Sequence, residues 1–146
     1  MRSANEIAGM VLKAARGAGM PLGCAEELSR AAPNLAARDA LAIVPKLLAL
    51  DFAAPAYVEN AISGGHPVHA IIAWRDFCAS GLEVRLETAV PPDLLGAMQT
   101  ATPQAGPFDI APDIWDKLQS FAERTFVPET DASRLAGAGA GLTDND

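Results

Sequence analysis

The spacing of apolar residues predicts a helix at the start of the chain. Ser3 followed by Glu6 forms a capping box, in which each side chain bonds the backbone amide of the other residue. Apolar residues then recur at helical spacing up to Ala18, where glycines on either side favour a stop. We therefore predict a first helix from about Ala4 to Ala18.

Prolines and glycines predict the limits of the next helices. Pro21 suits the first turn of a second helix, which Pro33 is expected to end, so the chain begins with a helical hairpin. A third helix is expected from about Leu35 to Leu50, with a kink at Pro45, which lacks a backbone donor. A fourth, short helix is predicted from Pro55, with Tyr57, Val58, Ala61 and Ile62 before the pair Gly64-Gly65.

The pattern changes in the middle of the chain. Val68 to Trp74 is an almost continuous apolar run, which is typical of a buried strand. Residues Leu82 to Glu87 alternate strictly between apolar and charged, which predicts a strand with one solvated face. Ala79 to Gly81 can turn the chain between them, so we expect an antiparallel hairpin that needs helices or a further strand for stability.

Two more helices are predicted after this hairpin. A short one opens at Pro91-Pro92 and runs to about Gln99, and a loop from Thr100 to Pro107 follows. The last begins after Pro112 and carries an apolar stripe. The predicted class is α+β, an N-terminal helical hairpin and further helices packed with a small antiparallel β-hairpin or sheet.

The length of 146 residues favours one domain, and half of the residues are hydrophobic, as in ordinary folded proteins. We assign residues 1–132 to a single globular domain. Residues 133–146 form a glycine-rich segment that is either docked or disordered.

The charge of the chain argues against two classes of binding partner. The formal net charge is −7, and the basic residues do not cluster, which argues against nucleic acid and anionic membranes as partners. No signal-peptide pattern and no apolar run long enough to span a bilayer is present, so we expect a cytoplasmic protein. Its cysteines, Cys24 and Cys78, are then expected to be reduced.

The glycine-rich segment is the strongest candidate site. Glycines can present successive backbone amides to an anion, and Arg134 could clamp a carboxylate or phosphate. A frayed tail is the alternative, and Asp144 with Asp146 could instead hold a hard cation or only solubilise the end. The candidate ligand-binding residues are Arg134, Gly137, Gly139, Gly141, Asp144 and Asp146, with Glu26 and Glu27 of the second helix.

Soft ligands give a weaker signal. His66 and His69 with the two cysteines could be proposed for zinc, but neither a Cys-x-x-Cys pair nor a helical histidine spacing supports this, so we predict no metal and no cofactor. Cys78, near Arg75 and His69 in sequence, is compatible with a reactive thiolate or, alternatively, with a small buried side chain.

Two blocks at the ends of the chain form a recognisable combination. The first comprises Asn5 to Ile7, Lys13 to Gly19 and Gly23 to Glu27, and the second comprises Ser133-Arg134 and Gly137 to Asp146. In these blocks the chain resembles an uncharacterised bacterial family, a domain of unknown function. The resemblance implies no activity, cofactor or catalytic residue.

Two functional hypotheses follow. The first is a non-enzymatic cytoplasmic protein that binds a small anionic ligand or acts as an accessory or assembly subunit, with Arg134 and the glycine-rich end at its site. The second is a small-molecule enzyme that uses Glu26 or Glu27 and Asp144 or Asp146 as acid-base groups and Arg134 as an anion clamp. We also expect a homodimer, because a small domain with apolar helical patches often needs them covered.

Overall fold

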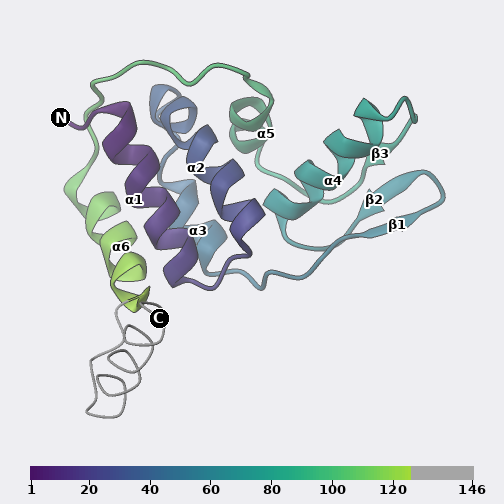
Figure 1. The fold of residues 1–146 in the computed structure, drawn as a ribbon, viewed down its shortest axis with the longest axis horizontal. Helices are drawn as coiled ribbons and strands as arrows, with labels where there is room; N and C mark the ends of the chain where they lie inside the picture. The colour runs from purple at the N-terminus through teal and green to yellow at the C-terminus, as the bar shows by residue number, and fades with distance from the viewer. Residues whose placement is uncertain (126–146) are drawn as a thin grey trace, which may run out of the picture.

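The computed structural model describes residues 1–125 and confirms the α+β class (Figure 1). One part, called the body below, consists of α1 (Ala4–Gly17), α2 (Leu22–Ala37), α3 (Ile43–Leu48), α5 (Pro92–Gln99) and α6 (Pro112–Ala122) with the 3-10 turn η1 (Glu123–Thr125). The other part, called the arm, extends to one side and consists of β1 (Ala56–Val58), β2 (Ala61–Ser63), α4 (Pro67–Ala79) and β3 (Arg85–Leu86).

The helical hairpin of α1 and α2 opens the body as predicted. The Ser3 hydroxyl accepts a hydrogen bond from the Glu6 amide at 3.2 Å, and the Glu6 carboxylate accepts one from the Ser3 amide at 2.8 Å. The predicted end of α2 at Pro33 is wrong, because the helix continues to Ala37. Pro33 is buried in the body core, and this packing outweighs the hydrogen bond that a proline cannot make.

The single kinked helix expected over 35–50 is also wrong. Residues up to Ala37 belong to α2, and the chain then turns at Asp39, which has a φ of 54°. The next helix, α3, begins only at Ile43. Pro45 therefore lies in a first turn, where a backbone N–H has no partner within the helix, and it interrupts nothing.

One continuous apolar cluster fills the body. Gly17 at the end of α1 allows α1 and α6 to approach closely, because a Cβ atom at this position would overlap the backbone carbonyl of Phe121. The largest fully buried side chains of the cluster are those of Ile7, Val11, Leu28, Leu35, Val44, Val68, Ile71, Leu94 and Leu118.

The segment from Pro55 to Gly65, predicted as a helix, is a β-hairpin. β1 pairs antiparallel with β2, and Tyr57 lies opposite Ile62. Glu59 and Asn60 connect the strands with φ angles of 51° and 61°. Positive φ at both central residues is the mark of a type I′ turn, whose twist matches that of the paired strands. The apolar residues around this turn thus reflect pairing and not a helical stripe.

The predicted strand over 68–74 is wrong, because these residues form most of α4. Val68 and Ile71 pack into the body core, whereas Ala70 and Trp74 face the small sheet of the arm. A helix that is covered on two sides is apolar nearly all round, and its sequence then looks like a buried strand. The Trp74 indole N–H donates to the Val84 carbonyl at 2.8 Å and ties α4 to the segment before β3.

The strand predicted over 82–87 is reduced to β3, and its partner differs from the expected one. β3 pairs with β2 in parallel, Ala61 opposite Arg85, so the sheet is mixed with the order β1-β2-β3. The expected antiparallel hairpin with residues 68–74 is therefore wrong. Val84 is buried as the alternation predicts, but Leu82 is 49% exposed.

The predictions for the two helices after the arm and for the loop between them are confirmed. α5 ends at Gln99, the segment from Thr100 to Pro107 has neither helix nor strand, and α6 begins at Pro112. The Arg2 guanidinium lies 4.1 Å from the centre of the Trp115 ring, which holds the start of the chain against α6. None of the helices described is both long and apolar enough to cross a bilayer.

Candidate functional site

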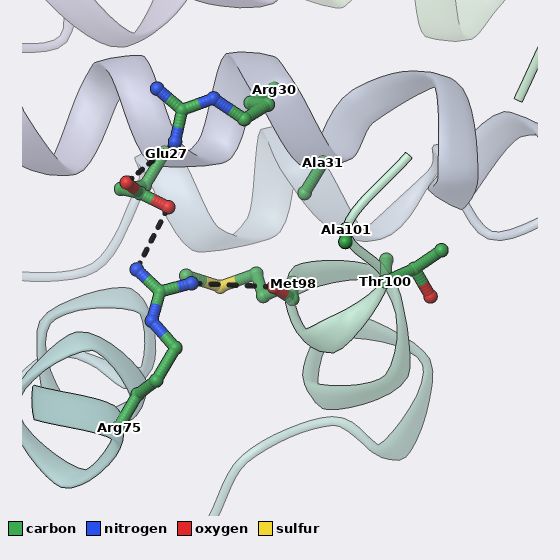
Figure 2. Close-up of a pocket in the computed structure, with 8 residues that line it drawn as sticks. Glu27, Arg30, Ala31, Arg75, Met98, Thr100 and Ala101 are labelled. Atoms are coloured by element: carbon green, nitrogen blue, oxygen red, sulfur yellow. Dashed lines mark hydrogen bonds and ion pairs between the residues drawn. The ribbon is translucent and has the colours of Figure 1, made fainter. Parts of the chain in front are cut away.

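A polar cavity of about 150 Å³ lies where α2 and α4 meet the C-terminal end of α5 (Figure 2). α2 supplies both charged and apolar lining, α4 supplies one arginine, and the end of α5 with the following residues closes the other side. The volume is sufficient for several water molecules or for one small anionic group. The lining residues are Glu27, Arg30, Ala31, Arg75, Ala97, Met98, Thr100 and Ala101.

Two guanidinium groups converge on the Glu27 carboxylate. Arg30 Nη1 lies 2.7 Å from Oε1, and Arg75 Nη2 lies 2.9 Å from Oε2. Arg75 also donates through Nη1 to the Met98 carbonyl at 3.3 Å, so its side chain bridges α2 and the last turn of α5 (Figure 2). The Arg75 guanidinium lies at the C-terminal end of α5, where the carbonyl groups of the last turn carry partial negative charge.

The charges of this cluster do not cancel. Burial alone would raise the pKa of Glu27, but the hydrogen bonds from Arg75 and Arg30 outweigh it and hold that pKa below its ordinary value. Glu27 is therefore ionised at neutral pH. Two guanidinium groups against one carboxylate leave one positive charge, and no second carboxylate lines this cavity within the described part of the chain.

Hydrogen bonds behind the cavity fix its α5 side. The buried Asn34 side chain donates to the Ala97 carbonyl at 3.3 Å and accepts from the Gln104 amide at 2.8 Å. The Thr100 hydroxyl donates to the Gly96 carbonyl at 2.8 Å and points away from the two arginines (Figure 2). These bonds thus hold the wall formed by Ala97 to Ala101, and the Thr100 hydroxyl already donates its proton within α5.

Of the residues predicted as one site, the structure describes Glu26 and Glu27. Glu27 lines the cavity, whereas the neighbouring Glu26 is exposed and does not. The other predicted residues, Arg134, Gly137, Gly139, Gly141, Asp144 and Asp146, lie outside the described residues.

Two arginines of the cavity were not proposed as site residues from the sequence. The pair Glu27 and Arg30 has the i, i+3 spacing at which side chains meet on one helix face, and this signal could have been noticed. Arg75 could not be placed, because the prediction assigned most of the segment before it to a strand. Only the helix α4 turns this side chain toward α2.

The soft ligands do not form a metal centre. His66, His69 and Cys24 surround a tightly closed hollow beside Phe52, but Cys78 lies elsewhere, with Asn60 and Leu82. No group of three or more histidine, cysteine or acidic residues among those described is arranged to hold a metal ion. Both cysteines are free thiols, Cys24 buried and Cys78 exposed. Cys78 does not share its hollow with His69 or Arg75.

His66 has a structural role at the start of α4. Its Nδ1 accepts the Val68 amide at 3.1 Å, so Nε2 carries the proton and donates to the Leu47 carbonyl at 2.8 Å. Burial lowers the pKa of His66, and the nearby His69 lowers it further, although the bond to Leu47 acts in the opposite direction. The ring is thus a neutral helix cap that joins the arm to α3.

Fold and site together define a small α+β protein with a polar cavity built around paired arginines. The chain belongs to a family described as a protein of unknown function, DUF3726, whose model matches residues 2–86. This match confirms the resemblance to a domain of unknown function and covers Glu27, Arg30 and Arg75. No curated protein and no solved structure matches the chain.

Proposed function

We propose that this is a cytoplasmic bacterial protein that binds a small anionic ligand, a carboxylate or a phosphate, at Arg30 and Arg75. The observation that carries the proposal is the convergence of two guanidinium groups from different helices on a single carboxylate at the edge of a cavity. This retains the anionic ligand expected from the sequence and relies on residues of α2 and α4.

The hydrogen-bonding capacity of the two arginines supports the proposal. A guanidinium group has five N–H donors. Arg75 uses two of its nitrogens toward Glu27 and Met98, and Arg30 uses one toward Glu27. The remaining N–H groups can reach an oxyanion, either beside Glu27 or in its place, and charge-assisted bonds of this kind are the strong ones.

The state of Glu27 favours binding over acid-base catalysis. A general acid needs a pKa raised toward neutrality. The pKa of Glu27 is shifted in the opposite direction, and both of its oxygens are engaged by arginines. Glu27 is better suited to hold the guanidinium groups in place until an anion competes for them.

Calorimetric titration with inorganic phosphate and with succinate, at constant ionic strength, tests the proposal. Arg75→Gln removes a charged donor, worth about 1.5–3 kcal/mol, so Kd should rise about tenfold or more. Glu27→Gln removes the internal competitor and should lower Kd. Arg38→Gln is the matched control, because Arg38 directly follows α2 as its C-cap residue and pairs with an acid, Asp93 at 3.8 Å, outside the cavity.

The proposal is wrong if neither anion binds the wild-type protein or Glu27→Gln. It is also wrong if Arg75→Gln and Arg38→Gln weaken binding equally, since the anions would then only sense the overall charge.

We further propose self-association as a homodimer, which is supported by the exposed apolar side chains of the arm. Tyr57, Val58 and Leu82 are each more than two-fifths exposed, and Tyr57 stacks on Phe77 at a centroid distance of 4.5 Å. Light scattering of the wild-type protein and of Val58→Lys measures the mass. A monomeric wild-type mass at every concentration tested contradicts this part.

A further inference from the structure

A second concavity lies on the body, between α3 and α6, and is called the α3–α6 groove below. It encloses about 600 Å³ and shares no residue with the arginine cavity. Pro45 contributes an apolar surface from α3, and Ile114 and Phe121 contribute apolar surface from α6. Lys46, Lys117 and the carboxylate of Asp113 also line it, so the groove combines an apolar floor with a net charge of one positive unit.

The two lysines are available to a partner. Lys46 is exposed and has no ion pair within the described part of the chain. Lys117 lies 3.9 Å from Asp113, but both side chains are about two-thirds exposed, and a pair of that kind contributes little. An acidic segment with apolar side chains would complement this groove.

We propose that residues 126–146 of this chain bind in the α3–α6 groove, with the part from Phe126 to Leu135 on its floor. The chain continues into this segment directly from η1, at the Phe121 end of the groove. The segment contains four acidic side chains and one basic side chain, so its charge is opposite to that of the two lysines. Glu129 and Asp131 are the acidic residues within the part placed on the groove.

Length and tethering support this occupant. A helix of 11 residues such as α6 is about 16 Å long, whereas ten extended residues span about 33 Å. The segment can therefore turn back and follow α6 along its whole length. Attachment to the same chain gives an effective concentration on the order of millimolar, so even weak contacts hold it in place.

Cleavage of the full chain by an arginine-specific protease tests the inference. Arg134 is the only arginine in residues 126–146, and mass spectrometry distinguishes its product from that of cleavage at Arg124. If the segment occupies the groove, Lys46→Glu and Lys117→Glu should each accelerate cleavage after Arg134 by about two- to fivefold, because cleavage follows the released population. Raised salt should accelerate wild-type cleavage in the same way.

Arg85→Glu is the control, since it makes the same charge change on the exposed arm, far from α6 (Figure 1). A variant that carries both Lys46→Glu and Lys117→Glu should regain protection when Glu129→Lys and Asp131→Lys are added, because the charges of groove and segment are then exchanged.

Equal rates in Lys46→Glu, Lys117→Glu and Arg85→Glu would overturn the inference. Protection that grows with protein concentration would overturn it too, since the segment would then occupy the groove of a second copy. Neither result bears on the arginine cavity, which is tested separately by anion binding.

Discussion

The body and the arm of this protein bury their apolar residues in different ways. In the body, one continuous cluster collects side chains from α1, α2, α3, α5 and α6. In the arm, the separate cluster contains only three buried side chains, those of Ile62, Ala70 and Val84. The arm depends on α4, whose Val68 and Ile71 belong to the body cluster. The comparison indicates that the arm is stable because it shares a helix with the body, not because it has a sufficient core of its own.

This difference predicts unequal cooperativity. Segments with few buried apolar contacts open locally at a lower free energy than the whole molecule unfolds. We therefore expect β1, β2 and β3 to open while α1 and α2 remain folded.

The largest effect is expected from truncating a core side chain in each part. Leu28 and Ile62 are both fully buried, one in the body and one in the arm. Leu28→Ala should lower the free energy of unfolding by about 2–5 kcal/mol, because it leaves a cavity in a densely packed cluster. Ile62→Ala should lower it less and should mainly accelerate hydrogen exchange at the Arg85 and Glu87 amides, which bond to the backbone of β2 and its turn.

Urea unfolding measures the first effect, and hydrogen exchange followed by mass spectrometry or NMR measures the second. If Ile62→Ala accelerates exchange equally in α1 and in β3, the arm and the body form one cooperative unit and the distinction fails.

The next largest effect on stability is expected at Asn34, which joins α2 to the end of α5 and the loop after it. Asn34→Ala leaves the buried Ala97 carbonyl and the Gln104 amide without their partner, a loss of about 1–3 kcal/mol. The variant should also weaken anion binding, because the α5 wall of the cavity loses its support. Gln99→Ala, at an exposed position of α5, is the control. Thermal unfolding with and without phosphate compares the two, and equal melting temperatures would contradict the role of Asn34.

The same contrast explains how much of the fold could be predicted. In the body, a capping box, prolines and helical periodicity predicted α1 and α5 nearly to the residue and the start of α6, because a helix with one buried face leaves a local signal. In the arm, α4 is covered on two sides and its periodicity disappears. The type I′ turn at Glu59 and Asn60 carries no glycine, which is the usual hairpin signal. The β1–β2 hairpin was therefore predicted as a helix and most of α4 as a strand, whereas β3 lies within a predicted strand.

The candidate site shows the same limit. Glu27 was proposed from its place on α2, but its partner Arg75 comes from the arm, and their contact depends on how α4 crosses α2. No local pattern contains that crossing. Sequence reasoning thus proposed one residue of the cavity as a site residue and missed the pair of arginines that gives it charge.

A smaller effect on the unfolding free energy is expected from pH, through His66, which joins the arm to α3. The pKa of His66 is lowered in the folded protein, so the unfolded chain binds a proton first as the pH falls. Stability should therefore be complete above the unfolded pKa of about 6.5 and should decrease as the pH falls below it. His69 is the other titratable histidine nearby, and Cys24 is the neighbouring thiol.

His66→Asn tests this assignment, because asparagine also caps helices but does not titrate in this range. Unfolding free energies measured between pH 5 and pH 8 should vary less in this variant than in the wild type, with His69→Asn as the control. An unchanged pH dependence in His66→Asn would assign the titration to another group.

The smallest effect is expected from the ion pairs of the arm. Arg85 bonds the Glu59 carbonyl and the Glu87 carboxylate, both at 3.3 Å, but its side chain is 65% exposed. An exposed pair of this kind contributes about 0.2–1 kcal/mol, so Arg85→Gln should change the unfolding free energy far less than Ile62→Ala does. Exchange at the Glu87 amide should likewise remain close to that of the wild type. If Arg85→Gln instead opens the sheet as far as Ile62→Ala does, charges and not the shared helix hold the arm together, and the contrast with the body must be explained by electrostatics.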